Sequence, residues 1–327
     1  MHRPPWNWKA AARQALSFAV LGGLLVLMFQ VTSANLQSRG IQSGFDFLWK
    51  PATTPVFDSP LAFEAGVDTF ARAFAAGALN SLKITIAAIV AATVLGVAVG
   101  LGRLSHNALA RALCGGYVEV MRNIPVLLHI FLWYGLVLEL PPISEADAAG
   151  SLAIASNRGI YLAWFTSQAE GGWSFVLPRV EGLEITGGIT MTPEFFALFL
   201  GISLYTAAFI AEIVRASVES VARGQWEASA ALGVPRGIVL RGVILPQAFR
   251  VGVPSLTSEY LGIFKNSTLA VAIGYQDFMA VSETMLTDTG QAVEVMAIVM
   301  LFYAVVSLLV SGAMHVFERR NMQWGAR

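Results

Sequence analysis

Long stretches without charged residues dominate the pattern of hydrophobic and polar positions along this chain. About 20 residues of α-helix, rising 1.5 Å per residue, cross the ~30 Å hydrocarbon layer of a bilayer. The pattern therefore predicts an all-α integral membrane protein with about six transmembrane helices. The expected spans are residues 15–31, 81–102, 118–140, 193–216, 255–275 and 292–315.

The first apolar stretch follows three basic residues, Arg3, Lys9 and Arg13, as the core of a secretory signal peptide also does. Such a core usually has about 7–15 residues and is followed by a small-residue cleavage site. Residues 15–31 are longer, and no clear cleavage site follows them. We therefore expect an anchor helix.

The fourth stretch carries the signals of a helix start. Thr192 is a good N-cap, Pro193 stands where its missing N–H has no cost, and Glu194 meets the positive end of the helix dipole. Further along, Glu212 stands three residues before Arg215 on one helical face. This spacing predicts an ion pair near the membrane surface.

Basic residues are distributed unequally between the connecting segments. If the amino terminus is inside, the inner segments hold most of the Lys and Arg, which is the usual bias of cytoplasmic loops. Both termini are then cytoplasmic. The outer segments 32–78 and 141–192 are rich in Gly, Pro, Ser and acidic residues, as expected for a solvated extracytoplasmic face.

Composition excludes several classes of function. The chain of 327 residues is 56% hydrophobic and only 13% charged, with a net charge of zero, so no nucleic-acid partner is expected. Its single cysteine, Cys114, permits no internal disulfide and no CxxC pair. Neither a metal-ligand spacing of histidines nor a Gly-rich phosphate loop occurs, so the chain itself is expected to bind no cofactor and to hydrolyse no ATP.

The inner segment 217–250 is longer than a turn between two membrane helices needs. Gln225–Leu232 contains strong helix formers, Gly233 ends the run, and Pro235 prevents its continuation. Small side chains keep the exposed face of this short helix narrow, which suits a groove on another protein, and Trp226 can anchor one flank. We predict a helix that lies across the membrane surface.

The same segment carries a motif. Glu227-Ala228-Ser229, three residues, Gly233, nine residues and Val243-Ile244-Leu245-Pro246 resemble the EAA signature of ABC importer permeases, from which Ser229 and Val243 depart conservatively. Further matches resemble the polar amino acid permeases, and most of all the general L-amino acid subgroup. They begin at Arg122-Asn-Ile-Pro, Tyr205-Thr-Ala-Ala, Arg223-Gly-Gln-Trp and Phe264-Lys-Asn-Ser, and they cover roughly 75–140 and 190–318.

This resemblance implies a type I ABC importer permease fold in a bacterial cytoplasmic (inner) membrane. A cytoplasmic coupling helix between spans four and five would dock on an ATPase subunit, present in two copies that hold ATP and Mg. Membrane lipid, a second permease subunit, identical or related, and an extracytoplasmic amino acid-binding protein are the other implied partners. A surface helix without a partner is the alternative interpretation. The coupling residues implied are Gln225, Trp226, Glu227, Ala228, Ser229 and Gly233.

The resemblance also implies a substrate pathway along the fourth and fifth spans. Lys265 would attract a carboxylate, unless it pairs with Glu259 or reaches an interface. His129 is interpreted as a packed core residue rather than a ligand. The pathway candidates are Tyr205, Thr206, Lys265, Asn266 and Ser267.

Three regions are expected: an anchor region (1–75), a permease domain (76–318) and a cytoplasmic tail (319–327). The permease domain would contain the insert 141–192 and the coupling loop 217–250. An ion-coupled secondary carrier that uses intramembrane ionisable groups is the alternative function. A membrane scaffold or a membrane enzyme is a third class, but the sequence offers no nucleophile or carboxylate pair for catalysis.

Overall fold

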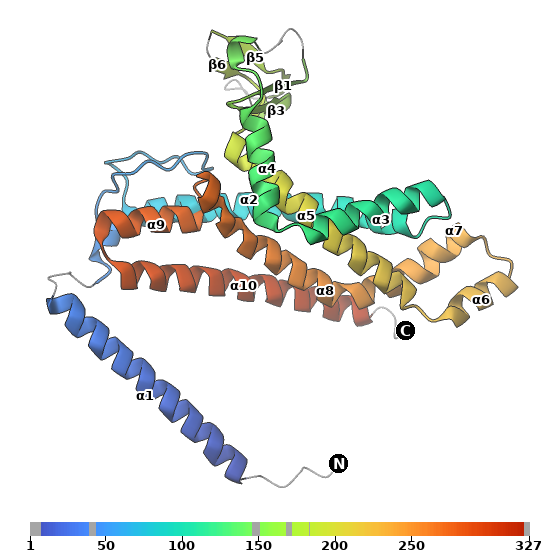
Figure 1. Ribbon diagram of the computed structural model, residues 1–327, viewed down its shortest axis with the longest axis horizontal. Helices are drawn as coiled ribbons and strands as arrows, with labels where there is room; N and C mark the ends of the chain where they lie inside the picture. Colours follow the sequence, from blue (N-terminus) through green and yellow to red (C-terminus); the bar gives the residue numbers. More distant parts are fainter. Residues whose placement is uncertain (1–7, 39–43, 146–150, 168–171, 183, 324–327) are drawn as a thin grey trace.

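The computed structural model describes residues 8–38, 44–145, 151–167, 172–182 and 184–323. Most of them are helical, and the helices after α1 form an elongated bundle (Figure 1). The α-helices are α1 (Trp8–Ser38), α2 (Phe70–Arg103), α3 (Ala108–Asn123), α4 (Val126–Leu138), α5 (Pro193–Glu219), α6 (Arg223–Ala231), α7 (Arg236–Val239), α8 (Leu245–Asn266), α9 (Phe278–Thr289) and α10 (Ala292–Gln323).

Within the described residues, three helices are long and apolar enough to cross a membrane: α2, α5 and the Ala292–Arg319 part of α10. A fourth span results if the bent pair α3 and α4 counts as one. In α1 the apolar part is only Leu16–Thr32, and the predicted span 255–275 is divided between α8 and a 3₁₀ turn, η4 (Ser267–Ile273). The count of six spans thus stays a prediction.

The predicted span 118–140 is not one straight helix. It is broken between α3 and α4, whose axes differ by 103°. Pro125 explains the break, because a proline disfavours helical backbone in the residue before it, and Ile124 is extended with φ −105° and ψ 130°. A continuous third span was therefore the wrong prediction.

The expectation of an all-α protein is also wrong, because the segment between α4 and α5 contains seven short strands. They form a small lobe beyond the end of α4 (Figure 1). β1, β2 and β7 make one antiparallel sheet, and β3–β4 and β5–β6 are separate hairpins. The strands are β1 (Ala153–Ser156), β2 (Gly159–Leu162), β3 (Trp164–Ser167), β4 (Trp173–Val176), β5 (Arg179–Glu181), β6 (Glu184–Thr186) and β7 (Ile189–Met191).

The start of α5 is as predicted. The Phe195 N–H donates to Thr192 Oγ1 at 3.2 Å, and Pro193 occupies the first helical position. Helix α5 then packs between α2 and α4 and contributes much of the largest core cluster. Fully buried aliphatic side chains of this cluster are Ile84, Ile130, Leu198, Ile202, Ile210 and Ile263.

Two ends of the bundle differ in character. Helices α6 and α7 project from one end, whereas the segment before α2, which includes the 3₁₀ turn η1 (Asp46–Trp49), lies with α9 at the opposite end (Figure 1). Another 3₁₀ turn, η2 (Ile143–Glu145), follows α4 toward the strands. Helix α6, which is predicted to contact a partner protein, therefore lies far from the segment before α2.

A buried carboxyl group caps α9. Asp277 Oδ1 accepts the Ala280 N–H at 2.8 Å, and the neighbouring Phe278 N–H donates to Ser81 Oγ at 2.9 Å. Burial raises the pKa of Asp277 from 3.8 to about 7. Between these two pH values, the Asp277 carboxyl group is therefore protonated in the folded protein and ionised in the unfolded chain.

This pKa predicts that the contribution of Asp277 to stability falls as pH rises from about 4 to 7 and is constant above that range. Between pH 5 and 8 the loss should be about 3 kcal/mol. Asn caps helices as well as Asp does and does not titrate, so Asp277→Asn is the matched control. We expect the thermal midpoint of the purified wild type to fall more steeply with pH than that of Asp277→Asn. Parallel pH profiles would contradict the prediction.

Candidate functional site

The short helix α6 is an exposed rod, and none of its residues is buried. It spans Arg223–Ala231, close to the predicted Gln225–Leu232. Glu227, Ala228, Ala230 and Ala231 are exposed and Ser229 is half-buried. The Glu227 side chain makes no hydrogen bond or ion pair with any residue that the structure describes. One side of the helix is therefore free to contact another protein.

Trp226 connects this rod to the bundle. Its half-buried ring packs against a cluster built from the end of α5, from α7 and from the start of α8. Movement of α6 would therefore be transmitted to two long helices through packed side chains rather than through a loose loop. The buried members of this cluster are Val218, Val221, Val239, Ile244 and Ala248.

The carboxyl end of α6 is closed by a Schellman motif. The Gly233 N–H donates to Ala230 O at 3.0 Å, and the Val234 N–H donates to Ser229 O at 3.1 Å. Gly233 has φ +67°, a left-handed conformation that residues with a Cβ adopt at a cost. The glycine of the motif is thus required by the backbone at the point where the rod ends.

Replacing this glycine should loosen the rod. We expect Gly233→Ala to cost about 1 kcal/mol in the stability of α6, because the φ is unfavourable even though no atom lies within 4 Å of the added Cβ. Gly224→Ala is the matched control, since Gly224 lies inside α6 in equally open space, where alanine favours the helix. Amide hydrogen exchange of α6 should be faster in the first variant and slower in the second. Equal exchange rates would contradict this role of Gly233.

Beyond α6 the chain returns to the bundle through a distorted helix. Between α7 and α8 lies a π-helical turn, η3 (Leu240–Ile244), in which the Leu245 N–H donates to Leu240 O. Pro246 follows directly and donates no N–H, and its ring disfavours the regular α-helical ladder at this point. The second half of the motif therefore marks a built-in bend between α6 and the fifth predicted span.

A broad groove of about 1180 Å³ lies beside α6. Its charged and polar lining is mixed in sign, with Arg223 and Arg236 near Glu219 and Glu227. Arg236 Nη1 and His106 Nε2 are 3.2 Å apart, which brings the loop after α2 to the same groove. The groove thus combines the motif helix with the ends of α2 and α5.

A charge network lies on the last turns of α5. The predicted Glu212–Arg215 ion pair is present, and Glu212 is also paired with Arg103 of α2. Arg215 reaches Glu219 at 2.5 Å, and Arg122 Nη1 lies 4.0 Å from Glu212 Oε2. Sequence reasoning missed Arg103 and Arg122, because nothing in local spacing links residues on separate helices.

Next to this network is a cavity of about 300 Å³. Arg122, Glu212 and Glu259 line it, together with Phe209 and with small and aliphatic residues of α5 and α8. The guanidinium of Arg122 lies 5.0 Å from the centre of the Phe209 ring. The cavity thus offers both signs of charge and an aromatic wall.

The predicted pathway residues do not line either of these two cavities. Tyr205 is half-buried, with its ring 4.9 Å from the Phe209 ring, and Thr206 is buried. Lys265 is exposed, Asn266 is half-buried, and the buried Ser267 donates to Phe264 O at 2.8 Å. The five residues are therefore divided between α5, the end of α8 and the start of η4, and none of them lines the groove or the cavity described above.

The structure bears on one alternative for Lys265, its pairing with Glu259, and on the interpretation of His129. No ion pair joins Lys265 to Glu259 among the described residues. His129 is buried, its Nε2 is 3.2 Å from Met121 O, and its ring lies 5.9 Å from that of Tyr205. These contacts are those of a packed core residue, as predicted.

Comparison with known families decides the class of the protein. The profile of the family described as "Binding-protein-dependent transport system inner membrane component" matches residues 92–323, which contain α6, the groove and the charge network. The chain belongs to this family. All the coupling and pathway candidates lie inside the matched region.

Relatives in the family align over nearly the whole chain. A putative amino-acid ABC transporter permease protein, YhdX of Escherichia coli K12, is 38% identical over 94% of this chain and 92% of its own length. The general L-amino acid transport system permease protein AapQ of Rhizobium johnstonii is 34% identical over 98% of this chain and 96% of its own. The similarity to the general L-amino acid permeases is thus confirmed.

Solved structures show the same fold. A crystal structure of an amino acid ABC transporter with histidines matches 77% of this chain and 95% of its own chain, with a TM-score of 0.57 and 23% identity. An inward-facing MetNI methionine ABC transporter matches with a TM-score of 0.53 and 17% identity. This protein therefore has the type I importer permease fold of its family.

Proposed function

We propose that this protein is the permease subunit of an ATP-driven amino acid importer, with α6 as the coupling helix. The observation that carries the proposal is the position of the motif residues: they form an exposed rod, closed at Gly233 and fixed to the bundle by Trp226. A partner that closes on nucleotide can do work on a membrane bundle only through a stiff contact. Gln225, Trp226, Glu227, Ala228, Ser229 and Gly233 are the proposed coupling residues.

In the proposed assembly, two copies of a cytoplasmic ATPase hold ATP and Mg beneath two permease subunits, identical or related. An amino acid-binding protein delivers substrate at the opposite, extracytoplasmic end, and membrane lipid surrounds the bundle. The names of the relatives support the amino acid cargo, since they also include the glutamate/aspartate import permease proteins GltJ and GltK of Escherichia coli. The ion-coupled carrier is not favoured by membership of this family.

The proposed topology has six spans and both termini in the cytoplasm. The Lys and Arg bias of the sequence supports this orientation, with α1 as an anchor, α3 and α4 as a bent third span, and α8 with η4 as the fifth. In this arrangement residues 76–318 form the permease domain. The insert 141–192 and the segment before α2 then face the binding protein.

The proposed substrate pathway runs along α5, α8 and η4. Lys265 supports it, because its exposed ammonium has no ion-pair partner among the described residues and can meet a carboxylate on the pathway. Closure of two permease subunits would bring the separated candidates together. Tyr205, Thr206, Lys265, Asn266 and Ser267 remain the proposed contacts.

Reconstitution tests the function directly. The permease, its ATPase and the binding protein are placed in proteoliposomes, and uptake of each of the twenty L-amino acids is measured with and without ATP. We expect uptake that requires both ATP and the ATPase. Uptake driven by a proton or sodium gradient in the absence of the ATPase would contradict the proposal and identify a carrier.

A further inference from the structure

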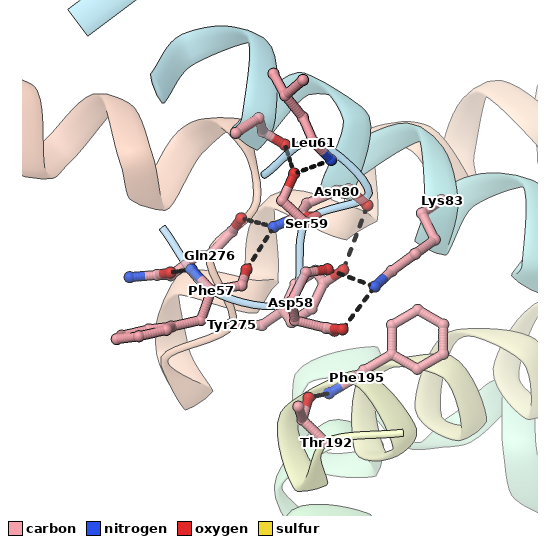
Figure 2. Close-up of polar contacts among 11 residues, drawn as sticks. Phe57, Asp58, Ser59, Leu61, Asn80, Lys83, Thr192, Phe195, Tyr275 and Gln276 are labelled. Carbon is pink, nitrogen blue, oxygen red and sulfur yellow. Dashed lines mark hydrogen bonds and ion pairs between the residues drawn. The ribbon is translucent and has the colours of Figure 1, made fainter. Parts of the chain in front are cut away.

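The segment before α2 folds over one end of the bundle and places a carboxylate on a lysine of α2 (Figure 2). Lys83 Nζ is 2.9 Å from Asp58 Oδ1 and donates to the backbone oxygen of the same residue at 2.7 Å. Among the described residues, no other acidic side chain is paired with this ammonium. One residue of a loop thus provides its charge balance.

Two aromatic rings also lie near the half-buried side chain of Lys83. Nζ lies 4.7 Å from the centre of the Phe195 ring on α5 and 6.0 Å from that of Tyr275, in the turn before α9 (Figure 2). Ring faces attract a cation but carry no formal negative charge. The ammonium of Lys83 therefore still requires a carboxylate, which either Asp58 or a ligand can supply.

Asp58 occupies this position in an unfavourable state. It is the one non-glycine residue with positive φ, +55°, in the part of the chain that the structure describes. Its second carboxylate oxygen, Oδ2, is buried and has no hydrogen-bond partner. Both features oppose the contact with Lys83, so a ligand carboxylate without them can compete for the same ammonium.

An unused acceptor lies on the same face of α2. Asn80, fully buried, stands three residues before Lys83, and its Nδ2 donates to Phe57 O at 3.1 Å and to Gln276 O at 2.8 Å. Its Oδ1 has no partner. A cation for a carboxylate and an acceptor for an ammonium are the two groups that a zwitterion requires.

We propose that Lys83, between Phe195 and Tyr275, is a binding position for the α-carboxylate of an incoming amino acid, and that Asp58 is an internal competitor for it. Asn80 Oδ1 would accept from the α-ammonium group. When the loop residue leaves, substrate takes its place on the lysine. This inference rests on the proposed function, because it concerns the same cargo at the end of the bundle opposite α6.

Equilibrium binding separates a competitor from an ordinary structural ion pair. The permease with its ATPase is placed in nanodiscs without the binding protein, and the carbon-14-labelled L-amino acid that the wild type imports fastest is the probe. Asp58→Asn should lower its Kd about tenfold, because the competitor is weakened. Lys83→Met should raise the Kd at least tenfold, and the double variant should behave like Lys83→Met. Lys83→Arg, which keeps the charge, should lie between wild type and Lys83→Met.

The matched control is Thr54→Val. Thr54 lies on the same segment and bonds Asp288 at 3.0 Å, and Thr53 bonds the same carboxylate at 3.2 Å. Loss of the Thr54 hydroxyl therefore leaves the segment attached and the Asp58–Lys83 contact intact, and the Kd should stay near that of wild type. A shift of the Kd in the same direction in Asp58→Asn and Lys83→Met would overturn the inference. An unchanged Kd in Asp58→Asn, or no measurable binding of the labelled amino acid to this variant, would also overturn the inference. If wild-type proteoliposomes import no amino acid at all, the proposed function fails instead.

Discussion

Glu227→Lys should release the ATPase from the permease while the permease stays folded. Glu227 is exposed on α6 and has no partner within the described structure, so the change should alter the stability of the fold by less than about 0.5 kcal/mol. In a docking contact, however, a cation that replaces an anion costs several kcal/mol. We expect affinity for the ATPase to fall at least about 100-fold, which corresponds to about 2.7 kcal/mol.

Co-purification and a thermal melt together check this result. The variant should lose the ATPase on affinity purification and keep the thermal midpoint of the wild-type permease. Glu283→Lys is the matched control, because Glu283 is an exposed carboxylate on α9, at the opposite end of the bundle (Figure 1). It makes the same change in net charge and should retain the ATPase. Retention of the ATPase by Glu227→Lys would remove α6 from the coupling contact.

The elements that could be predicted from the sequence are those that local chemistry determines. Helices α2, α5 and α10 follow from long apolar runs, and the start of α5 follows from a good N-cap at Thr192. The motif helix was placed within two residues, because helix formers, Gly233 and Pro235 all act over one or two turns.

The missed features depend on short signals or on distant contacts. Strands of three or four residues are too short for their alternation to stand out, so the lobe between α4 and α5 was interpreted only as a solvated segment. Pro125 was visible, but a proline does not reveal that the helix axis turns by 103°. The sequence gives no sign that Asp58 meets Lys83 or that Arg103 meets Glu212, because each pair joins separate elements.

One missed signal was present in the sequence itself. Gly96 and Gly100 form a G-x-x-x-G pattern in α2, which in membrane helices permits close approach of two backbones. In the structure, α5 packs on these glycines: a Cβ on Gly96 would lie 2.6 Å from Ile210 Cβ, and one on Gly100 would lie 2.8 Å from Ala211 O. The close contact of α2 with α5 thus requires residues without side chains.

Gly96→Leu should therefore separate α2 from α5. The nearest obstacles include Ile210 Cβ and the backbone oxygen of Ala207, at 2.6 and 2.9 Å, so a change of rotamer alone does not make room. Overpacking of this kind costs about 1–3 kcal/mol or more. We expect a lower thermal midpoint, because the packing of the core around Ile210 is lost. We also expect transport to be lost, since α5 leads directly to α6.

Gly312→Leu is the matched control, because Gly312 lies in α10 with no atom within 4 Å of an added Cβ. It adds the same apolar side chain to a membrane helix and should leave the thermal midpoint and the ATPase association unchanged. If the two leucine variants have the same thermal midpoint, the contact between α2 and α5 does not limit stability. If only Gly96→Leu is destabilised, the two glycines set the distance between the helix that carries Lys83 and the helix that carries the coupling rod, and thus connect the two ends of the permease.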